Sequence, residues 1–220
     1  DSFRFEFTGR AAHAAAMPWE GRNALNAVQL LFHASDMMRQ HVKEDVRIHG
    51  VVKEGGLAPN IVPDFGAAEF YVRSRQRAEL SGVSEWLCDC ARAAALATRT
   101  EVKIISTSPP LNNLTRNPAG EALLARLYAG QRLELSAESE LPLGSSDIGE
   151  LDNYCPTFHP MLCVKKNLAL HTKEFAAEML TGLGHGSILT GAKIVSSFLL
   201  LLLPDETKLG EIKADYQARR

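Results

Sequence analysis

Cysteine and excess charge are both scarce in this sequence. Four cysteines in 220 residues do not suggest a disulfide framework, so we expect a reducing, cytoplasmic setting. The 24 Lys and Arg residues against 26 Asp and Glu residues give a formal net charge of -2, and the balance is even in both halves of the chain. Neither half therefore favours nucleic acid or an anionic membrane surface as a partner.

Long apolar runs are almost absent as well. The longest one, residues 188–203, is shorter than the about 20 apolar residues that a membrane-spanning helix needs, and it includes Lys193, Ser196 and Ser197. This run predicts a buried helix, with a membrane anchor as the alternative. No secretion signal is expected, because the sequence opens directly into an alternating segment, and this abrupt opening suggests a piece of a longer protein.

The first half of the chain alternates between strand and helix patterns. Residues 2–8 place Phe3, Phe5 and Phe7 on one face and polar residues on the other, which is the period of a half-buried strand. The next segments continue this order: a helix at 23–41, strands at 46–53 and 67–73, a helix at 77–97 and a strand at 101–106. The order β-α-β-β-α-β predicts a ferredoxin-like α+β domain of residues 1–109, with both helices on one face of the sheet.

The second half, residues 110–220, shows a different pattern. Helices are predicted at 117–130, 186–203 and 206–217, and short strand-like pieces at 157–164 and 168–170. So few strands do not make a self-contained sheet domain. This half is therefore interpreted as part of an α/β domain whose remaining strands lie elsewhere.

Two of the seven histidines stand out. His13 lies in a loop among five alanines that leave its ring free to project, although an ordinary loop histidine is the simpler interpretation. His171 follows the apolar run 167–170, and the carboxyl end of a buried strand is where α/β proteins place ligands and catalytic groups. One histidine cannot complete a zinc site, which needs three or four ligands, and the sequence has no HxxxH, HxH or CxxC motif.

Three further polar segments could carry chemistry. Asn60 lies between Pro59 and Pro63, which restrict the backbone, but an asparagine beside prolines is also an ordinary turn residue. Arg73 ends a predicted strand, where a guanidinium either extends to water or binds a carboxylate. Residues 144–147, Gly-Ser-Ser-Asp, lack the spacing and the Lys of a phosphate loop. They could still offer backbone N–H groups to an anion.

Four segments, in the same order, resemble motifs of metallopeptidase family 20. Residues 9–24 resemble the signature of its lid domain, in which Ala-His-Ala precedes a Pro, a Gly and an Asn-Ala pair. Residues 55–63 resemble the segment G-G-x-x-x-N-x-x-P, and Arg73 follows Asn60 by thirteen residues, as the carboxylate-binding arginine of the family does. The family includes aminoacylases, dipeptidases and p-aminobenzoyl-glutamate hydrolases.

The second half of the chain continues the resemblance. Residues 144–149 together with 156–160 resemble the segments G-S-x-D-x-G and P-x-x-H-P of the amidohydrolase branch, and His171-Thr172 resembles its H-[ST] metal-ligand motif. The similarity spans essentially the whole chain. It implies a lid and dimerisation domain followed by residues 110–220 as the last part of an α/β catalytic domain.

The resemblance also implies a role for each motif in the lid domain. His13 and Asn60 would reach into the active site of a partner subunit and hold the scissile carbonyl, while Arg73 would grip the substrate carboxylate. The expected reaction is metal-assisted hydrolysis of an amide bond by a homodimer. The expected substrate is an N-acyl amino acid, a dipeptide or an aminobenzoyl-glutamate-like compound.

For the second half, the resemblance implies a metal ligand and part of a substrate pocket. His171 would bind one of two divalent metal ions, zinc in the first place and manganese or cobalt as alternatives. Gly144 and Ser145 would line the floor of the pocket.

The sequence departs from the family in one important respect. The N-terminal catalytic half, which supplies the other metal ligands and the Glu that activates water, is absent, and these 220 residues contain no Glu-Glu pair. We therefore expect the chain alone to bind metal weakly and to hydrolyse nothing unaided. The alternative is a non-catalytic dimerisation or regulatory module, in which the uncovered sheet face and an edge strand recruit a second chain.

Overall fold

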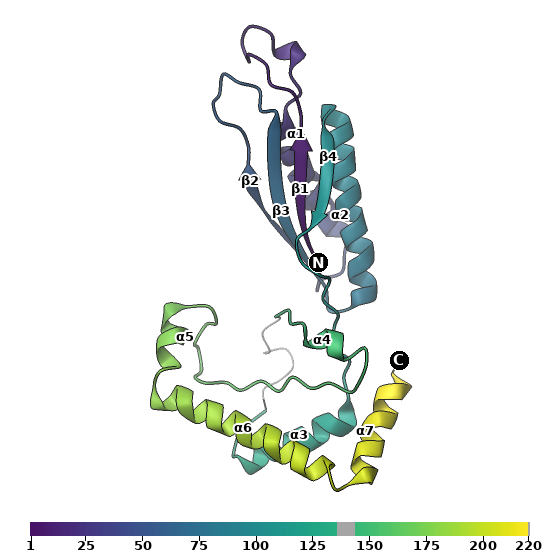
Figure 1. Cartoon of the computed structure of the whole chain (residues 1–220), viewed down its shortest axis with the longest axis vertical. Helices are drawn as coiled ribbons and strands as arrows, with labels where there is room; N and C mark the ends of the chain where they lie inside the picture. Colours follow the sequence, from purple (N-terminus) through teal and green to yellow (C-terminus); the bar gives the residue numbers. More distant parts are fainter. Residues whose placement is uncertain (136–143, 220) are drawn as a thin grey trace. The chain divides into compact units, whose positions relative to one another are not determined.

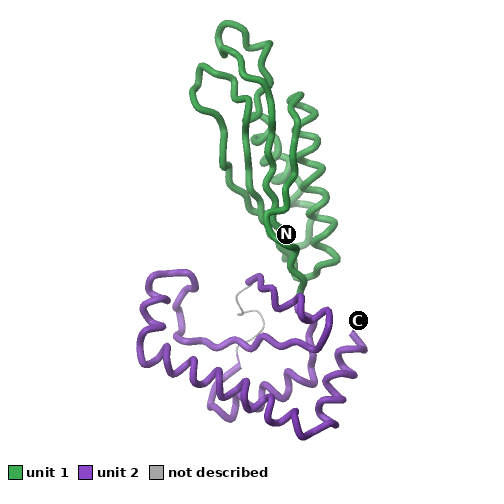
Figure 2. The backbone as a smooth tube through the Cα atoms, viewed as in Figure 1, with its two compact units in different colours: residues 1–113 green, residues 114–220 purple. Residues whose placement is uncertain are grey.

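The computed structural model describes residues 1–135 and 144–219, and the chain divides into two compact units, residues 1–113 and residues 114–220 (Figure 2). The domain boundary expected at Pro109 and Pro110 lies inside the first unit, close to its end.

Unit 1 contains an antiparallel sheet of four strands in the order β2-β3-β1-β4 (Figure 1). The strands are β1 (Ser2–Thr8), β2 (Arg47–Glu54), β3 (Phe65–Arg73) and β4 (Glu101–Ser106). The central strand β1 pairs with β3 on one side and β4 on the other, so that Phe5 lies opposite Ala68 and Ile104. All four predicted strands are confirmed.

Helices α1 (Ala24–Met38) and α2 (Arg77–Thr98) both pack on one face of this sheet (Figure 1). Two short 3-10 helices, η1 (Pro18–Glu20) and η2 (Arg39–His41), flank α1. The buried core contains aromatic residues from the strands, with the Phe5 and Phe70 rings edge to face at 5.9 Å. The predicted ferredoxin-like order, with both helices on one face, is thereby confirmed.

The other face of the sheet carries charged side chains. Arg4 lies at its centre and pairs with Glu6 at 2.8 Å and with Glu54 and Glu69 at 3.2 Å. Half-exposed ion pairs of this kind add little to stability, typically below about 1 kcal/mol each. They nevertheless make this face polar, so it is suited to contact with water.

Unit 2 is helical among its described residues. It contains α3 (Pro118–Gly130), α4 (Ile148–Leu151), α5 (Lys173–Glu178), α6 (Gly182–Leu202) and α7 (Glu206–Ala218). The helices predicted at 117–130, 186–203 and 206–217 are confirmed. The strands predicted at 157–164 and 168–170 are wrong, because these residues form turns and irregular backbone. An isolated extended segment has no neighbouring strand to complete its hydrogen bonds, and no strand is present among the described residues of unit 2.

The core of unit 2 is small. Leu123, Phe198 and Ile212 are the buried members of its main cluster, and the Phe158 ring packs edge to face on Phe198 at 5.2 Å. The buried Asn117 side chain links two helices: its Oδ1 accepts a hydrogen bond from the Gly120 N–H at 3.0 Å, and its Nδ2 donates to the Ile212 carbonyl at 2.8 Å. This asparagine therefore caps α3 and holds α7 against it.

Helix α6 is mostly exposed, which corrects the expectation of a buried helix. Gly184, Ile194 and Phe198 are buried on one side, whereas Leu199 and Leu200 are 53% and 67% exposed. The expectation failed because an apolar sequence shows that a helix needs packing partners. It does not show that these partners belong to the same chain. By length and composition α6 is also apolar enough to cross a membrane.

Candidate active site at the loop end of unit 1

Three segments meet at the end of the sheet where β1 ends and β3 begins. They are residues 9–16, residues 21–24 and residues 60–64. Backbone hydrogen bonds of 2.7 to 2.9 Å join their bases: Gly9 N–H to the Asp64 carbonyl, Arg10 and Arg22 to each other in both directions, and Ala24 N–H to the Pro63 carbonyl. The loops are therefore tied to the sheet and to the start of α1 by main-chain contacts.

Two glycines are required for this arrangement. A Cβ atom on Gly9 would lie 2.0 Å from the Arg22 carbonyl oxygen, which is a backbone atom that cannot move aside cheaply. Gly56 has a φ of +106°, and a Cβ there would lie 2.7 Å from the Pro63 ring. Gly9 is thus explained by the close approach of the Arg22 backbone, and Gly56 by its positive φ.

The structure brings His13 and Asn60 together. The Ala14 N–H donates to the Asn60 carbonyl at 3.0 Å, and the Val62 N–H donates to the Ala12 carbonyl at 2.9 Å. These bonds make a short antiparallel bridge in which His13 pairs with Ile61. His13 and Asn60 are both exposed. Two predicted site residues that are 47 positions apart in sequence therefore lie on neighbouring loops.

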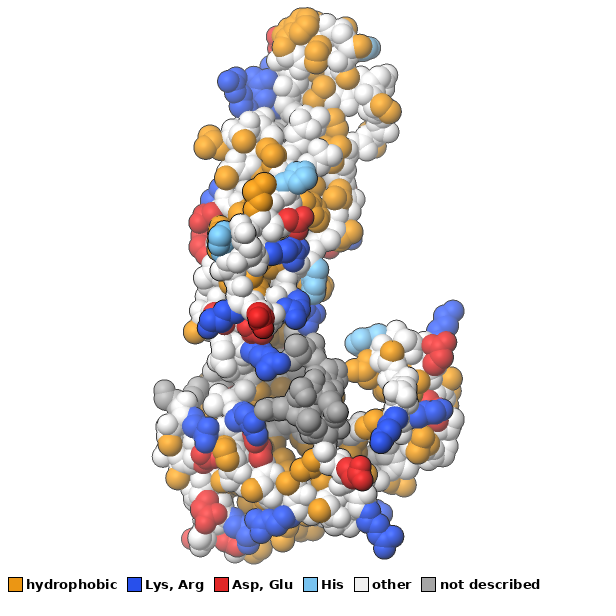
Figure 3. Space-filling model, turned by 180° about the vertical axis from the view of Figure 1, so that it is seen from behind, with side chains coloured by type: hydrophobic (Ala, Val, Ile, Leu, Met, Phe, Trp, Pro, Cys, Tyr) orange, Lys and Arg blue, Asp and Glu red, His pale blue; other side chains and the backbone are white. Residues whose placement is uncertain are grey.

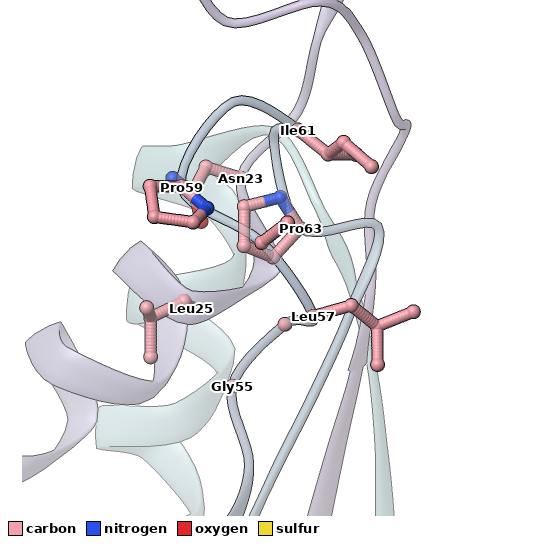
Figure 4. Close-up of a pocket in the computed structure, with 9 residues that line it drawn as sticks. Asn23, Leu25, Gly55, Leu57, Pro59, Ile61 and Pro63 are labelled. Atoms are coloured by element: carbon pink, nitrogen blue, oxygen red, sulfur yellow. The ribbon is translucent and has the colours of Figure 1, made fainter.

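A shallow cavity of about 390 Å³ lies beside the Asn60 loop (Figure 4). Its lining comes from the start of α1, through Asn23 and Leu25, and from the β2–β3 loop, residues 55–63. Figure 4 shows Leu57 pointing away from Leu25, and Leu57 is fully exposed. Asn23 was not among the predicted site residues, although an asparagine directly before a helix is a common cap; here it accepts from the Asn26 N–H at 3.1 Å.

Hydrophobic side chains gather at this loop end of unit 1 (Figure 3). Large exposed members of the group are Met17, Trp19, Leu57 and Ile61, and Trp19 is 70% exposed. Isolated exposed apolar residues are common on protein surfaces, whereas a group of them around polar candidates is typical of a contact surface.

Arg73 lies at the opposite end of the sheet. The loop end is marked by Thr8, which pairs with Phe65 at the start of β3, whereas Arg73 is the last residue of β3. At about 3.3 Å per residue, the eight steps from Phe65 to Arg73 span roughly 26 Å. The structure therefore does not bring Arg73 together with His13 and Asn60 within one copy of unit 1.

Charged groups of both signs lie near Arg73. Arg73 pairs in register with Arg47 across β2 and β3. The pKa of His49 is lowered, first by its partial burial and then by the positive charges of Arg73 and Arg39. An anionic side chain lies at this corner too, because the Asp45 carboxylate accepts hydrogen bonds from the Ser74 hydroxyl at 3.2 Å and from the Arg75 N–H at 2.8 Å.

The predicted site residues of unit 2 lie in exposed loops. Gly144 and Ser145 are exposed and precede α4, and their assignment to a pocket floor stays a prediction. His171 is exposed in a turn with a φ of +61°, which corrects the expectation of a histidine at the end of a buried strand. The next residue, Thr172, caps α5 by accepting the Phe175 N–H at 3.1 Å.

The described residues do not fit a complete metal centre. Residues 1–135 and 144–219 contain no group of three or more His, Cys, Asp or Glu side chains placed to hold a metal ion. His171 is a lone predicted ligand, and a protein zinc site takes at least three protein ligands. The proposed pair of metal ions therefore needs residues beyond those that the structure describes.

Comparison with known proteins shows which family model and which relatives this chain matches. Residues 1–99 match the family model described as the peptidase dimerisation domain. The sequence is 35% identical over 177 residues to the Xaa-Arg dipeptidase of Mus musculus, covering 77% of this chain and 40% of that protein. It is 23% identical over 271 residues to a p-aminobenzoyl-glutamate hydrolase subunit of Escherichia coli, covering 97% of this chain and 56% of the relative.

Solved structures show the same fold. An aminobenzoyl-glutamate utilization protein from Klebsiella pneumoniae aligns with a TM-score of 0.57 at 22% identity, over 69% of this chain and 39% of that chain. An aminopeptidase from Bacillus cereus aligns with a TM-score of 0.54 at 15% identity, over 69% of this chain and 40% of that chain.

Residues 1–99 are therefore a peptidase dimerisation domain. With the matching relatives, this confirms the resemblance to metallopeptidase family 20. The chain spans about 40% of the length of the dipeptidase and 56% of the hydrolase relative.

Proposed function

We propose that this chain is part of a metal-dependent amidohydrolase that cleaves the amide bond of N-acyl amino acids, dipeptides or aminobenzoyl-glutamate-like compounds. Residues 1–109 would be its lid and dimerisation domain, and residues 110–220 the C-terminal part of its catalytic domain. The match of residues 1–99 and the peptidase and hydrolase relatives support this proposal. Its proposed setting is cytoplasmic.

One geometric observation carries the proposal that the enzyme is a homodimer. The His13–Asn60 loops and Arg73 lie at opposite ends of β3, roughly 26 Å apart. An extended dipeptide spans only about 7 Å. A single lid therefore cannot present both ends to one substrate of this size, whereas two copies related by a two-fold axis can each supply one end.

The chemistry of the two ends suits different parts of such a substrate. His13 and Asn60 would donate hydrogen bonds to the scissile carbonyl oxygen, and donors of this kind gain strength as negative charge develops on that oxygen. Arg73 would bind the substrate carboxylate with two parallel N–H bonds. The in-register pairing of Arg73 with a second arginine, Arg47, supports that role.

The β2 edge together with α1 is the proposed dimer surface. Strand β2 is at the edge of the sheet, and all of its residues except Ile48 are exposed. Leu30 and Met37, which are 41% and 68% exposed, are seven residues apart on α1 and so share one side of that helix. An unpaired strand edge beside exposed apolar side chains invites a second chain.

The exposed side of α6 is the proposed contact with the rest of the catalytic domain. Ile188, Ala192, Val195 and Leu199 form an exposed stripe with spacings of four, three and four, which we call the α6 stripe. Such spacing keeps side chains on one helix face for packing against another element. Lys193 is turned away from the stripe and would be costly inside a bilayer, so we favour a protein partner over a membrane.

The metal ions of the proposed enzyme, zinc in the first place, would depend on ligands from that remaining part. With His171 as the lone predicted ligand, the chain by itself is expected to bind metal weakly and to have no activity. A non-catalytic dimerisation module is the second candidate, because the family model that matches residues 1–99 is that of a dimerisation domain.

Steady-state kinetics on a matched acid and amide substrate test the proposal. In an assembled enzyme that contains this chain and the rest of the catalytic domain, Arg73→Lys should raise KM for the acid far more than for the amide, because Lys lacks the planar fork of Arg. Asn60→Ala should lower kcat on both substrates. Equal and small effects of Arg73→Lys on the two substrates would contradict the carboxylate role, and no hydrolysis of either substrate would favour the dimerisation module.

A further inference from the structure

The imidazole ring of His13 is fixed by its own loop. Its Nδ1 atom accepts hydrogen bonds from the backbone N–H groups of Ala15 at 3.3 Å and Ala16 at 3.2 Å. The loop closes around these amides because the Met17 N–H donates to the His13 carbonyl at 3.1 Å. The ring therefore takes the place that an Asp, Asn or Ser oxygen takes in side-chain-capped turns.

The orientation of the ring follows from these two donors. Turning the ring over would place a carbon atom, which accepts no hydrogen bond, against the amides of Ala15 and Ala16. The bridge between Ala14 and Asn60 holds the loop from the other side, at 3.0 Å. The alanine side chains that follow His13 are too small to compete with the ring for this position.

The two bonds decide which ring nitrogen carries the proton. A neutral imidazole has one N–H donor and one acceptor nitrogen, and the partner of one nitrogen selects the state of the other. We propose that the amides of Ala15 and Ala16 hold His13 in the Nε2–H tautomer, so that its exposed nitrogen is a fixed hydrogen-bond donor. Ala15 and Ala16 are then positioning residues that act through their backbones.

The tautomer gives His13 a defined chemical role. An Nε2–H group can donate to a carbonyl oxygen and to the negative charge that develops on it. It cannot accept a proton from water at that nitrogen, so His13 would act as a donor and not as a general base. This meaning for catalysis rests on the proposed function, whereas the tautomer itself does not.

Nuclear magnetic resonance tests the tautomer directly in the chain of 220 residues. With nitrogen-15 in the histidine rings, two-bond proton–nitrogen correlations at alkaline pH distinguish the two neutral tautomers, and the His13→Gln variant identifies the His13 signals. We expect His13 to show the Nε2–H form alone. The internal control is His33, which is exposed on α1 and should show a mixture. A mixture at His13 equal to that at His33, or the Nδ1–H form, would overturn the proposal.

Two substitutions separate the effect of the amides from other effects in the loop. Ala16→Pro removes the nearer N–H donor and should introduce the Nδ1–H form at His13, whereas Ala16→Gly keeps the donor and should not. Identical tautomer populations in the wild type and Ala16→Pro would overturn the role assigned to the amide. If His13→Ala left turnover of the assembled enzyme unchanged, the proposed function of His13 would fail while the tautomer assignment stood.

Discussion

Units 1 and 2 have similar lengths but bury their apolar residues to very different extents. Unit 1 gathers 20 buried residues into one core cluster, whereas the cluster of unit 2 contains three. In unit 1 the four strands pair with one another, and both helices pack against the sheet of the same unit. Unit 2 leaves one side of α6 in water, so its helices have the pattern of a folded domain without all of its packing partners. The difference supports the proposal that unit 1 folds alone and that unit 2 needs further packing partners.

The largest effect is expected from the core of unit 1. Phe70→Ala should lower its free energy of unfolding by about 3–5 kcal/mol, the usual loss for a buried Phe. Phe198→Ala should cost unit 2 less, about 1.5–3 kcal/mol, because its surroundings are open. Both tryptophans, Trp19 and Trp86, lie in unit 1, so urea unfolding followed by tryptophan fluorescence reports this unit and circular dichroism reports both. Superimposable transitions with equal losses would contradict the difference between the units.

A smaller effect is expected at the buried asparagine of unit 2. Asn117→Ala removes both the cap on α3 and the bond to the Ile212 carbonyl, and should cost about 2 kcal/mol. The exposed Asn60→Ala is the matched control and should change stability by less than about 0.5 kcal/mol. Urea titrations followed by circular dichroism check both values. An equal response of the two variants would show that the Asn117 bonds add nothing to unit 2.

The α6 stripe should respond differently in the two forms of the protein. In this chain, Leu199→Lys should change the free energy of unfolding by less than about 0.5 kcal/mol, because the side chain is 53% exposed. In the assembled enzyme, where we propose that the stripe is covered, it should cost more than about 2 kcal/mol. Lys193→Glu, at an exposed position turned away from the stripe, is the control and should be tolerated in both forms. Thermal unfolding of both forms decides the matter, and a tolerated Leu199→Lys in the assembled enzyme would leave the stripe without a partner.

The smallest effect concerns the dependence of stability on pH. Burial, Arg73 and Arg39 lower the pKa of His49 below its unfolded value of about 6.5. In the window below that value the unfolded chain binds more protons than the folded one, so stability falls as the pH falls. His49→Gln should flatten this decline between about pH 7 and pH 5 while leaving stability at alkaline pH almost unchanged. Denaturation curves across this range provide the check, and identical slopes for the two proteins would exclude His49 as the cause.

Much of unit 1 could be predicted because local patterns agree with its fold. The alternation of Phe3, Phe5 and Phe7 indicates both a strand and its buried face, and the glycines at positions 9 and 56 mark turns with strict backbone needs. Local patterns also placed His13 and Asn60 in loops. Their proximity and the distance to Arg73 come from strand register, which periodicity does not specify.

Unit 2 was predicted less well for a physical reason. The helices were found because their periodicity is local, but the segments at 157–164 and 168–170 are apolar without a neighbouring strand to pair with. His171 accordingly lies in an exposed turn instead of at the end of a strand. The hydrogen bonds from the Ala15 and Ala16 amides to His13 could not be predicted from the sequence, because any residue except proline supplies a backbone N–H.

Mixing two inactive variants tests the central claim, that each active site draws on two copies of this chain. In the assembled enzyme, His13→Ala and Arg73→Ala should each abolish most of the turnover. If His13 comes from one copy and Arg73 from the other, dimers that contain one variant of each kind have one intact site. After subunit exchange, the mixture should recover about a quarter of the wild-type activity. A mixture that exchanges subunits and remains as inactive as its components would contradict the shared site.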